Sequence, residues 1–125
     1  MKEETLKARI RERYGKIAVS GNSDCCCAPQ ECCNTADFNP KESLISIGYN
    51  QKDLEAIPES SLLGLGCGAP IDFANLKNGE TVVDLGSGGG IDAFLASKRV
   101  GNKGMVIGID FTDDMIDKAR NAALK

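Results

Sequence analysis

Residues 81–92 read TVVDLGSGGGID, and this stretch decides the fold. It begins with a short apolar run, 81–83, that suits a buried strand. Asp84 and a glycine-dense turn, 86–90, come next, and apolar side chains then recur at the spacing of one helical face: Ile91, Phe94 and Leu95. Strand, turn and helix in this order predict a nucleotide-binding unit. Glycine lets the backbone approach a ligand that a side chain would exclude, and the free N–H groups of the new helix point at it.

The spacing of the glycines indicates which nucleotide. A phosphate loop needs a Lys and a Ser or Thr after its last glycine, and neither follows Gly90. A dinucleotide fingerprint needs a glycine three residues after Gly88, where Ile91 stands. The observed GxGxG pattern, with Asp84 two residues before Gly86, resembles the first motif of S-adenosylmethionine-dependent methyltransferases. A carboxylate suits that ligand, which carries an ammonium and a sulfonium, although the glycines alone are equally typical of a surface turn.

A second strand is predicted over 105–109, MVIGI, and it ends at Asp110. An acidic residue there, about 20 or more residues past the first glycine, is placed to accept hydrogen bonds from ribose hydroxyls. Asp110 follows Gly86 by 24 residues. Taken alone, Asp110 also reads as a helix-start acid beside Thr112, which we expect to cap a last helix. Both motifs in order, joined by a helix of suitable length, favour the nucleotide site.

The composition is that of one small globular domain, with 125 residues, 42% hydrophobic and 26% charged. A net charge of −3 argues against nucleic acid or an anionic membrane as a partner. No apolar run approaches membrane-spanning length, and the polar N-terminus does not read as a signal peptide. We therefore expect a cytoplasmic protein whose six cysteines are thiols rather than a disulfide framework.

Further helices are predicted around this unit. One covers residues 3–18, with an apolar face made by Leu6, Ile10, Tyr14 and Ile17. Another begins after the cap residue Asn50 and ends before Pro58, and Pro70 opens one that runs through Leu76. The last helix is expected to bury Met115, Ile116, Ala119 and Ala123.

Five cysteines gather in a loop predicted over 20–41, at positions 25, 26, 27, 32 and 33. Structural zinc sites favour a C-x-x-C pair, whereas four residues separate Cys27 from Cys32, and the chain has no histidine. A soft ion such as trivalent arsenic or copper(I) fits clustered thiolates equally well. Adjacent cysteines cannot all point at one centre, so a redox-sensitive loop without a site is the alternative.

The sixth cysteine, Cys67, stands between Gly66 and Gly68. Free cysteine is often a small buried hydrophobe. Glycine on both sides bares the backbone, however, and lets a thiol reach into a cavity, so we predict a functional role for Cys67.

Several stretches, taken in order, resemble the arsenite methyltransferases. They are ERYGKIA near the start, the cysteine loop, YNQKDLEAIPESSLLGLGCGAP, LKNGETVVDLGSGGGIDAFLASKRVG and GMVIGIDFTDDMIDKAR. The Gly-Cys-Gly-Ala-Pro piece is more specific than the glycine motif, which all class I methyltransferases share. The resemblance implies methyl transfer from S-adenosylmethionine to trivalent arsenic held by cysteine thiolates. The arsenic lone pair would attack the methyl group, so catalysis would be mainly positioning and would need no histidine base.

The resemblance also implies roles for individual residues. Cys67 would be the catalytic arsenic ligand, joined by cysteines of the loop, here Cys32 and Cys33. The cofactor-binding residues would be Asp84, Gly86, Gly88, Gly90, Asp110 and Phe111, with Asp110 on the ribose and Phe111 against the adenine.

We therefore predict an α/β protein with a partial Rossmann-like class I methyltransferase fold, strand–helix–strand–helix, preceded by a helical and cysteine-loop region. The expected boundary separates residues 1–76 from 77–125. The family continues with more strands and two further arsenic-binding cysteines, so the chain resembles its N-terminal portion. A doubly wound sheet has about six strands and only two are secure here, so unpaired edges prone to self-association are expected.

Two other functions stay open. One is a methyltransferase of a small organic acceptor, in which Cys67 fills the core. The other is a thiol-rich metal-binding module, in which the cysteine loop is the active part and the Rossmann half is a scaffold.

Overall fold

The computed structural model describes residues 3–21 and 39–125. In chain order its elements are α1 (Glu3–Ser20), α2 (Pro40–Ser46), α3 (Gln51–Glu55), the 3-10 helix η2 (Glu59–Ser61), α4 (Pro70–Ala74), β1 (Thr81–Leu85), α5 (Ile91–Val100), the 3-10 helix η3 (Gly101–Lys103), β2 (Met105–Ile109) and α6 (Asp113–Ala123). Within these ranges no helix is long and apolar enough to cross a membrane.

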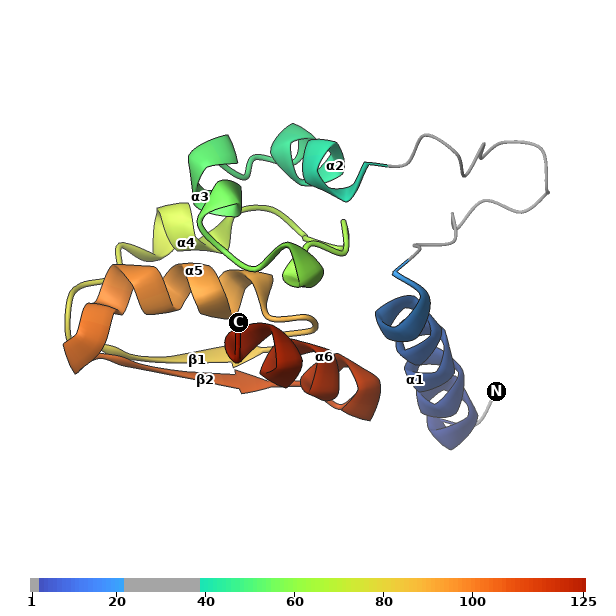
Figure 1. Cartoon of the computed structure of the whole chain (residues 1–125). Coiled ribbons are helices and arrows are strands. Elements are labelled where there is room, and N and C mark those ends of the chain that lie inside the picture. The colour runs from blue at the N-terminus through green and yellow to red at the C-terminus, as the bar shows by residue number, and fades with distance from the viewer. Residues whose placement is uncertain (1–2, 22–38) are drawn as a thin grey trace.

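The two strands form a parallel sheet with α5 as the crossover between them. Val82 lies opposite Val106, and Asp84 lies opposite Gly108. Figure 1 shows α5 lying along one face of this sheet. Parallel strands need such a crossover, because the chain must return to the end of the sheet where the first strand began before the second strand can run in the same direction. The predicted fold class and the order strand–helix–strand–helix are confirmed.

The opposite face of the sheet is apolar and exposed. Side chains alternate between the two faces of a strand, so the residues that alternate with Val82 and Val106 share this face. Each of them is at least two-fifths exposed: Val83, Leu85, Met105, Ile107 and Ile109.

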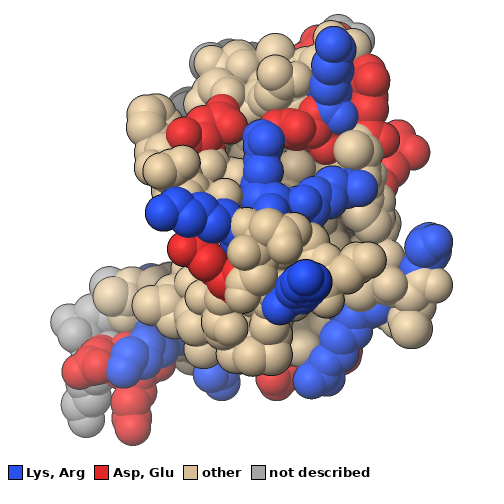
Figure 2. Space-filling view, turned by 90° about the vertical axis from the view of Figure 1, so that its left-hand side faces the viewer, with Lys and Arg blue, Asp and Glu red and all other residues tan. Residues whose placement is uncertain are grey.

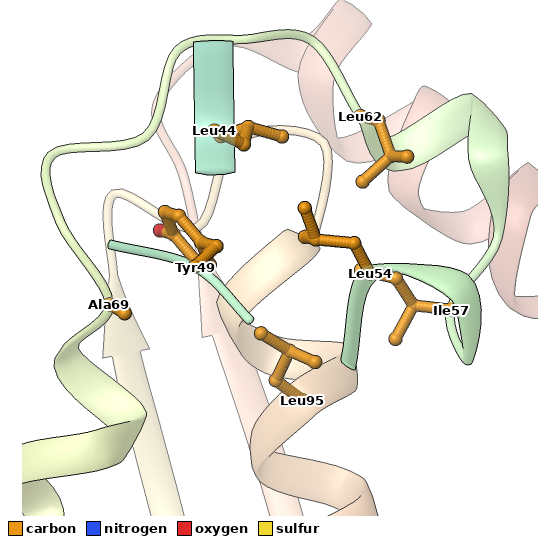
Figure 3. Packing of buried hydrophobic residues seen from close by; sticks show 7 residues of the cluster. All are labelled: Leu44, Tyr49, Leu54, Ile57, Leu62, Ala69 and Leu95. Atoms are coloured by element: carbon orange, nitrogen blue, oxygen red, sulfur yellow. The ribbon is translucent and has the colours of Figure 1, made fainter. Parts of the chain in front are cut away.

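The main core lies on the other side of α5. Figure 3 shows seven buried side chains that point toward one another from α2, α3, α5 and the segments between them: Leu44, Tyr49, Leu54, Ile57, Leu62, Ala69 and Leu95. Six of them precede residue 77, and the seventh, Leu95, belongs to α5. The expected boundary at residue 77 stays a prediction, and the two regions share this core.

An ion-pair cluster ties α5 to the short helices around it. Arg99 donates to Asp53 of α3 across 3.0 Å, and it lies 3.7 Å from Asp72 of α4. Figure 2 shows basic and acidic side chains intermixed over this side of the molecule rather than gathered by sign. These pairs are exposed, so their contribution to stability is small.

Helix α1 packs against α6 through its C-terminal half. Ile17 and Ala18 are buried with Met115 of α6, and Lys118 donates to the Ala18 carbonyl at 2.9 Å. The predicted apolar face was therefore only partly right. Ile17 is buried, whereas the side chain of Leu6, which lies on the same face, is 47% exposed, because α6 does not extend beside the first turns of α1.

The helix termini confirm some expectations and correct others. Asn50 caps α3 as predicted, since its side chain accepts from the Lys52 N–H at 2.9 Å. Thr112 stands at the N-cap of α6, but its buried side chain makes no capping hydrogen bond. In α6 the buried alanine is Ala122, and Ala123 is exposed. The helix opened by Pro70 ends at Ala74, before the predicted Leu76.

Candidate functional site

The glycine turn follows β1 and is built from left-handed backbone. Gly86, Gly88 and Gly90 have φ values of 73°, 52° and 95°. A Cβ atom on Gly86 or Gly88 would meet nothing within 4 Å, so the backbone there faces open space. A Cβ atom on Gly90 would lie 2.8 Å from Phe94 Cε2. The first two glycines are therefore required by conformation, and the third is required by packing as well.

The end of β2 holds this turn in place. The Gly86 and Ser87 N–H groups both donate to the Ile109 carbonyl, at 2.7 and 3.0 Å. The Gly88 N–H donates to Asp110 Oδ2 at 2.9 Å. A Cβ atom on Gly108 would lie 2.9 Å from Ser87 Oγ. Gly108 thus lets the turn approach β2. Sequence reasoning missed this role, although a glycine inside a strand often marks the close approach of another backbone.

Asp110 has a structural role besides the predicted one. Its Oδ2 accepts from Gly88, and its Oδ1 accepts from the Thr112 N–H at 2.8 Å. The carboxylate therefore links the glycine turn to the start of α6. An ionised carboxylate offers about four acceptor positions, so lone pairs remain for ribose hydroxyls.

Asp84 lies at the end of β1 beneath the turn. Its Oδ2 atom is buried and has no hydrogen-bond partner in the described part of the chain. Burial, and then the charge of Asp110, raise the pKa of Asp84. A buried carboxylate oxygen without a donor is costly, and an N–H or ammonium group from a ligand would relieve that cost.

Tyr49 and Asp92 form a pair that sequence reasoning did not single out. The Tyr49 hydroxyl lies 3.0 and 3.1 Å from the two Asp92 carboxylate oxygens, to which it donates. Burial raises the pKa of Asp92 to about 6, with the hydrogen bond from Tyr49 opposing the shift and the charge of Asp84 adding to it. Burial and the charge of Asp92 also raise the pKa of Tyr49. Asp92 stood within the quoted motif, but nothing local showed that Tyr49, 43 residues earlier, would reach it.

Cys67 is a free and exposed cysteine close to this pair. A Cβ atom on the preceding Gly66 would lie 2.7 Å from Tyr49 Cε2 and 2.9 Å from Leu44 Cδ2. The charge of Cys67 is a minor cause of the raised pKa of Tyr49, after burial and Asp92. The structure thus brings Cys67 toward the helix that follows the glycine turn. Its exposure does not fit the reading of Cys67 as a core filler.

Phe111 follows Asp110 and is half-exposed. The guanidinium carbon of Arg11, from α1, lies over its ring, 5.7 Å from the ring centroid. A cation at this distance is attracted by the ring face. The N-terminal helix therefore reaches the edge of the candidate site.

Two further arsenic ligands were predicted in the cysteine loop. Cys32 and Cys33 lie outside the described residues. Within the ranges 3–21 and 39–125, no three His, Cys, Asp or Glu side chains gather in a way that would hold a metal ion. Soft-ion binding therefore stays a prediction.

A cavity of about 360 Å³ lies between the end of β2 and α6. It is lined by Gly108, Ile109, Asp110, Asp113, Ile116, Asp117 and Arg120. Of the predicted cofactor-binding residues only Asp110 lines it, so we do not assign this cavity to the cofactor.

Comparison with known proteins agrees with this arrangement. Residues 76–125 match a family described as methyltransferase domain. Over 98% of its length the chain is 44% identical to an arsenite methyltransferase of Halobacterium salinarum, of which it covers 32%. It is 42% identical to an aklanonic acid methyltransferase of Streptomyces over 42% of the chain and 24% of that protein.

A solved structure is also similar, a SAM dependent methyltransferase from Aquifex aeolicus. The match has 30% identity and a TM-score of 0.39, and it covers 68% of this chain and 40% of that one. The chain spans about a third of the length of the Halobacterium relative. Residues 76–125 thus match a methyltransferase domain, and nearly the whole chain is similar to about a third of an arsenite methyltransferase.

Proposed function

We propose that this chain provides the cofactor-binding turn and one arsenic-binding thiol of an arsenite methyltransferase. The observation that carries the proposal is the approach of Cys67 to the glycine turn. An exposed thiol stands one residue from Gly66, which abuts Tyr49, and the Tyr49 hydroxyl binds Asp92 in the helix that the turn opens. Through Tyr49, the segment that carries a soft thiol ligand is therefore linked to the helix that the glycine turn opens.

The residues around the turn fit S-adenosylmethionine. Gly86 and Gly88 turn bare backbone toward open space, and the unpartnered Asp84 oxygen suits the ammonium of the methionine part. Free lone pairs on Asp110 suit the ribose, and the half-exposed Phe111 ring suits the adenine. Bound there, the cofactor would supply an electrophilic methyl group on its sulfonium.

Trivalent arsenic is the proposed substrate. Thiolates are soft ligands and leave the arsenic lone pair free to act as the nucleophile. Cys67 would hold the arsenic, with Cys32 and Cys33 as the proposed partners in this chain. Free thiolates require reducing conditions, so we place the reaction in the cytoplasm. Catalysis would consist mainly of holding substrate and cofactor at the right separation.

The proposal is tested with a protein of the relatives' full length, reduced thiols and methyl-labelled S-adenosylmethionine. We expect label on arsenic, and a fall of about tenfold or more in Cys67→Ser, while the cofactor Kd stays within about twofold. Label on an organic acceptor but not on arsenite would support the rival methyltransferase reading. Unchanged transfer to arsenic in Cys67→Ser would remove Cys67 from the site.

The 125-residue chain allows a simpler test of arsenic binding. Arsenite should protect Cys67 from alkylation, together with one or two loop cysteines, when each peptide is followed by mass spectrometry. In Cys67→Ser the protection of the loop cysteines should fall. Equal protection in both proteins would show that the loop binds arsenic without Cys67.

A further inference from the structure

We propose that Tyr49 and Asp92 are a positioning pair that holds the Cys67 segment at a fixed place relative to the glycine turn. The consequence for catalysis rests on the function proposed above, since it supposes arsenic on Cys67 and a methyl donor at the turn. The positional claim itself rests on contacts within this chain.

Asp92 is the end of the link that belongs to the glycine turn. It is the second residue of α5 and follows Gly90 by two positions. The first turn of α5 is fixed, since the Phe94 N–H donates to the Gly90 carbonyl at 2.8 Å. A hydroxyl that is hydrogen-bonded to Asp92 therefore has a fixed position relative to the glycine turn.

Tyr49 is the rigid middle of the link. Its side chain is only 3% exposed and packs in the core cluster with Leu44 and Leu95. Figure 3 shows its ring beside the other side chains of this cluster. The hydroxyl lies at nearly the same distance from the two Asp92 oxygens, 3.0 and 3.1 Å. Core packing fixes the ring, and the carboxylate fixes the direction of its hydroxyl.

Gly66 is the end that belongs to the cysteine segment. A Cβ atom there would lie 2.7 Å from Tyr49 Cε2 and 2.9 Å from Tyr49 Oη. Real side chains do not tolerate such approaches, so the backbone rests directly against the tyrosine only because residue 66 is glycine. Cys67 is the next residue, and its place is set by that contact.

The Tyr49 hydroxyl contributes a directed hydrogen bond to Asp92 rather than apolar packing. Phenylalanine would fill the same space between Leu44 and Gly66, so ring packing alone does not call for a tyrosine. Burial raises the pKa of Asp92, which shows that the carboxylate is held where its charge is costly. A polar pair of this kind contributes specificity of placement more than stability.

The test measures the alkylation rate of Cys67 in the reduced 125-residue chain, resolved by peptide mass spectrometry. It needs neither cofactor nor arsenic. We expect Tyr49→Phe and Asp92→Ala each to raise the rate about threefold or more, because the segment is released. The double variant should be no faster than either single variant, since both remove one link, whereas two unrelated defects would multiply. Asp92→Asn keeps an acceptor oxygen and should restore a rate near that of the wild type.

Tyr14→Phe is the matched control, because Tyr14 is the other tyrosine of the chain and lies on α1. It should leave the rate unchanged. Single variants that stay folded by circular dichroism and react like the wild type would overturn the proposal, as would multiplicative effects in the double variant. Should Tyr49→Phe fail to fold, the contrast between Asp92→Ala and Asp92→Asn decides alone.

A protein of the relatives' length separates this inference from the proposed function. There Tyr49→Phe should lower kcat for arsenite methylation while leaving the cofactor Kd unchanged. If the wild type transfers no methyl group to arsenic but the alkylation pattern holds, the proposed function fails and the positioning pair stands.

Discussion

Asp110 accepts hydrogen bonds that hold the glycine turn, and it is also the proposed ribose ligand, so its removal should affect both the turn and cofactor binding. We expect Asp110→Ala, in a protein of the relatives' length, to weaken S-adenosylmethionine binding by about 1.5–3 kcal/mol, the usual value of hydrogen bonds to a charged group. Asp110→Asn should fall between, because its amide oxygen can still accept from Gly88 or Thr112. Titration calorimetry gives the affinities. An alanine variant that is folded and binds with unchanged affinity would show that Asp110 serves only the turn.

Asp92 should make stability depend on pH. Its folded pKa of about 6 lies above the ordinary value of 3.8, so the fold loses stability as the pH rises from about 4 to about 6, and the loss is complete above about 6. The groups that face it are the Tyr49 hydroxyl and the charge of Asp84. Asp92→Asn should therefore stabilise the chain at pH 8, on the order of 1 kcal/mol after allowance for solvent screening of a half-buried group.

The gain from Asp92→Asn should shrink as the pH falls through 6 and vanish below about 4, where wild-type Asp92 is protonated in both states. Urea unfolding at several pH values measures it. A gain that is the same at pH 4 and pH 8 would mean that the charge of Asp92 is not its source.

At this scale, sequence reasoning succeeded where the relevant partners are close along the chain. The glycine turn and Asp84, near the end of β1, share one short stretch, so spacing alone predicted the strand and the turn. Tyr49 meets Asp92 only because α2, α3 and α5 enclose one core, and no local pattern encodes that meeting. The prediction that the Thr112 side chain caps α6 was wrong for a similar reason. The Thr112 N–H donates to Asp110, and the Thr112 side chain is buried.

Helix α1 offers a test of how elements pack. Ile17 and Leu6 were predicted on the same apolar face, yet Ile17 is 5% exposed and Leu6 is 47% exposed. Ile17→Ala should lower the free energy of unfolding by about 2–4 kcal/mol, because it leaves a cavity against Met115. Leu6→Ala is the matched control and should cost less than about 1 kcal/mol. Equal losses in denaturant unfolding would show that α1 packs along its whole length.

The accuracy of the element predictions follows from what a periodic pattern can encode. The strand over 105–109 was predicted with the bounds of β2, because glycine and aspartate flank an apolar run of strand length. Helix α2 has seven residues and owes its start to the side chain of Asn39, which accepts from the Lys41 and Glu42 N–H groups. It is too short for periodicity to reveal. A pattern shows which face of α1 is apolar, but not how far its partner extends.

For the whole molecule, the open sheet face predicts association of the 125-residue chain. Its five exposed apolar side chains lie beside strand edges that can pair with another copy. We expect the sedimentation coefficient to rise with concentration, and the paired change Leu85→Lys with Ile107→Lys to suppress that rise. Phe73→Lys is the control, because Phe73 is 88% exposed on α4, away from the sheet. A wild-type chain that stays monomeric at all concentrations would contradict the prediction.

The shared core also limits how this protein can be recombined. The match to the methyltransferase domain begins at residue 76, yet the six buried side chains that cluster with Leu95 all precede that point. A chimaera that joined residues 77–125 to a different N-terminal region would keep every cofactor motif, but it would lose the buried side chains that pack against α5. The unit that can be exchanged between relatives is thus the cluster from Leu44 to Leu95, and a crossover placed at the start of the recognised domain would cut through it.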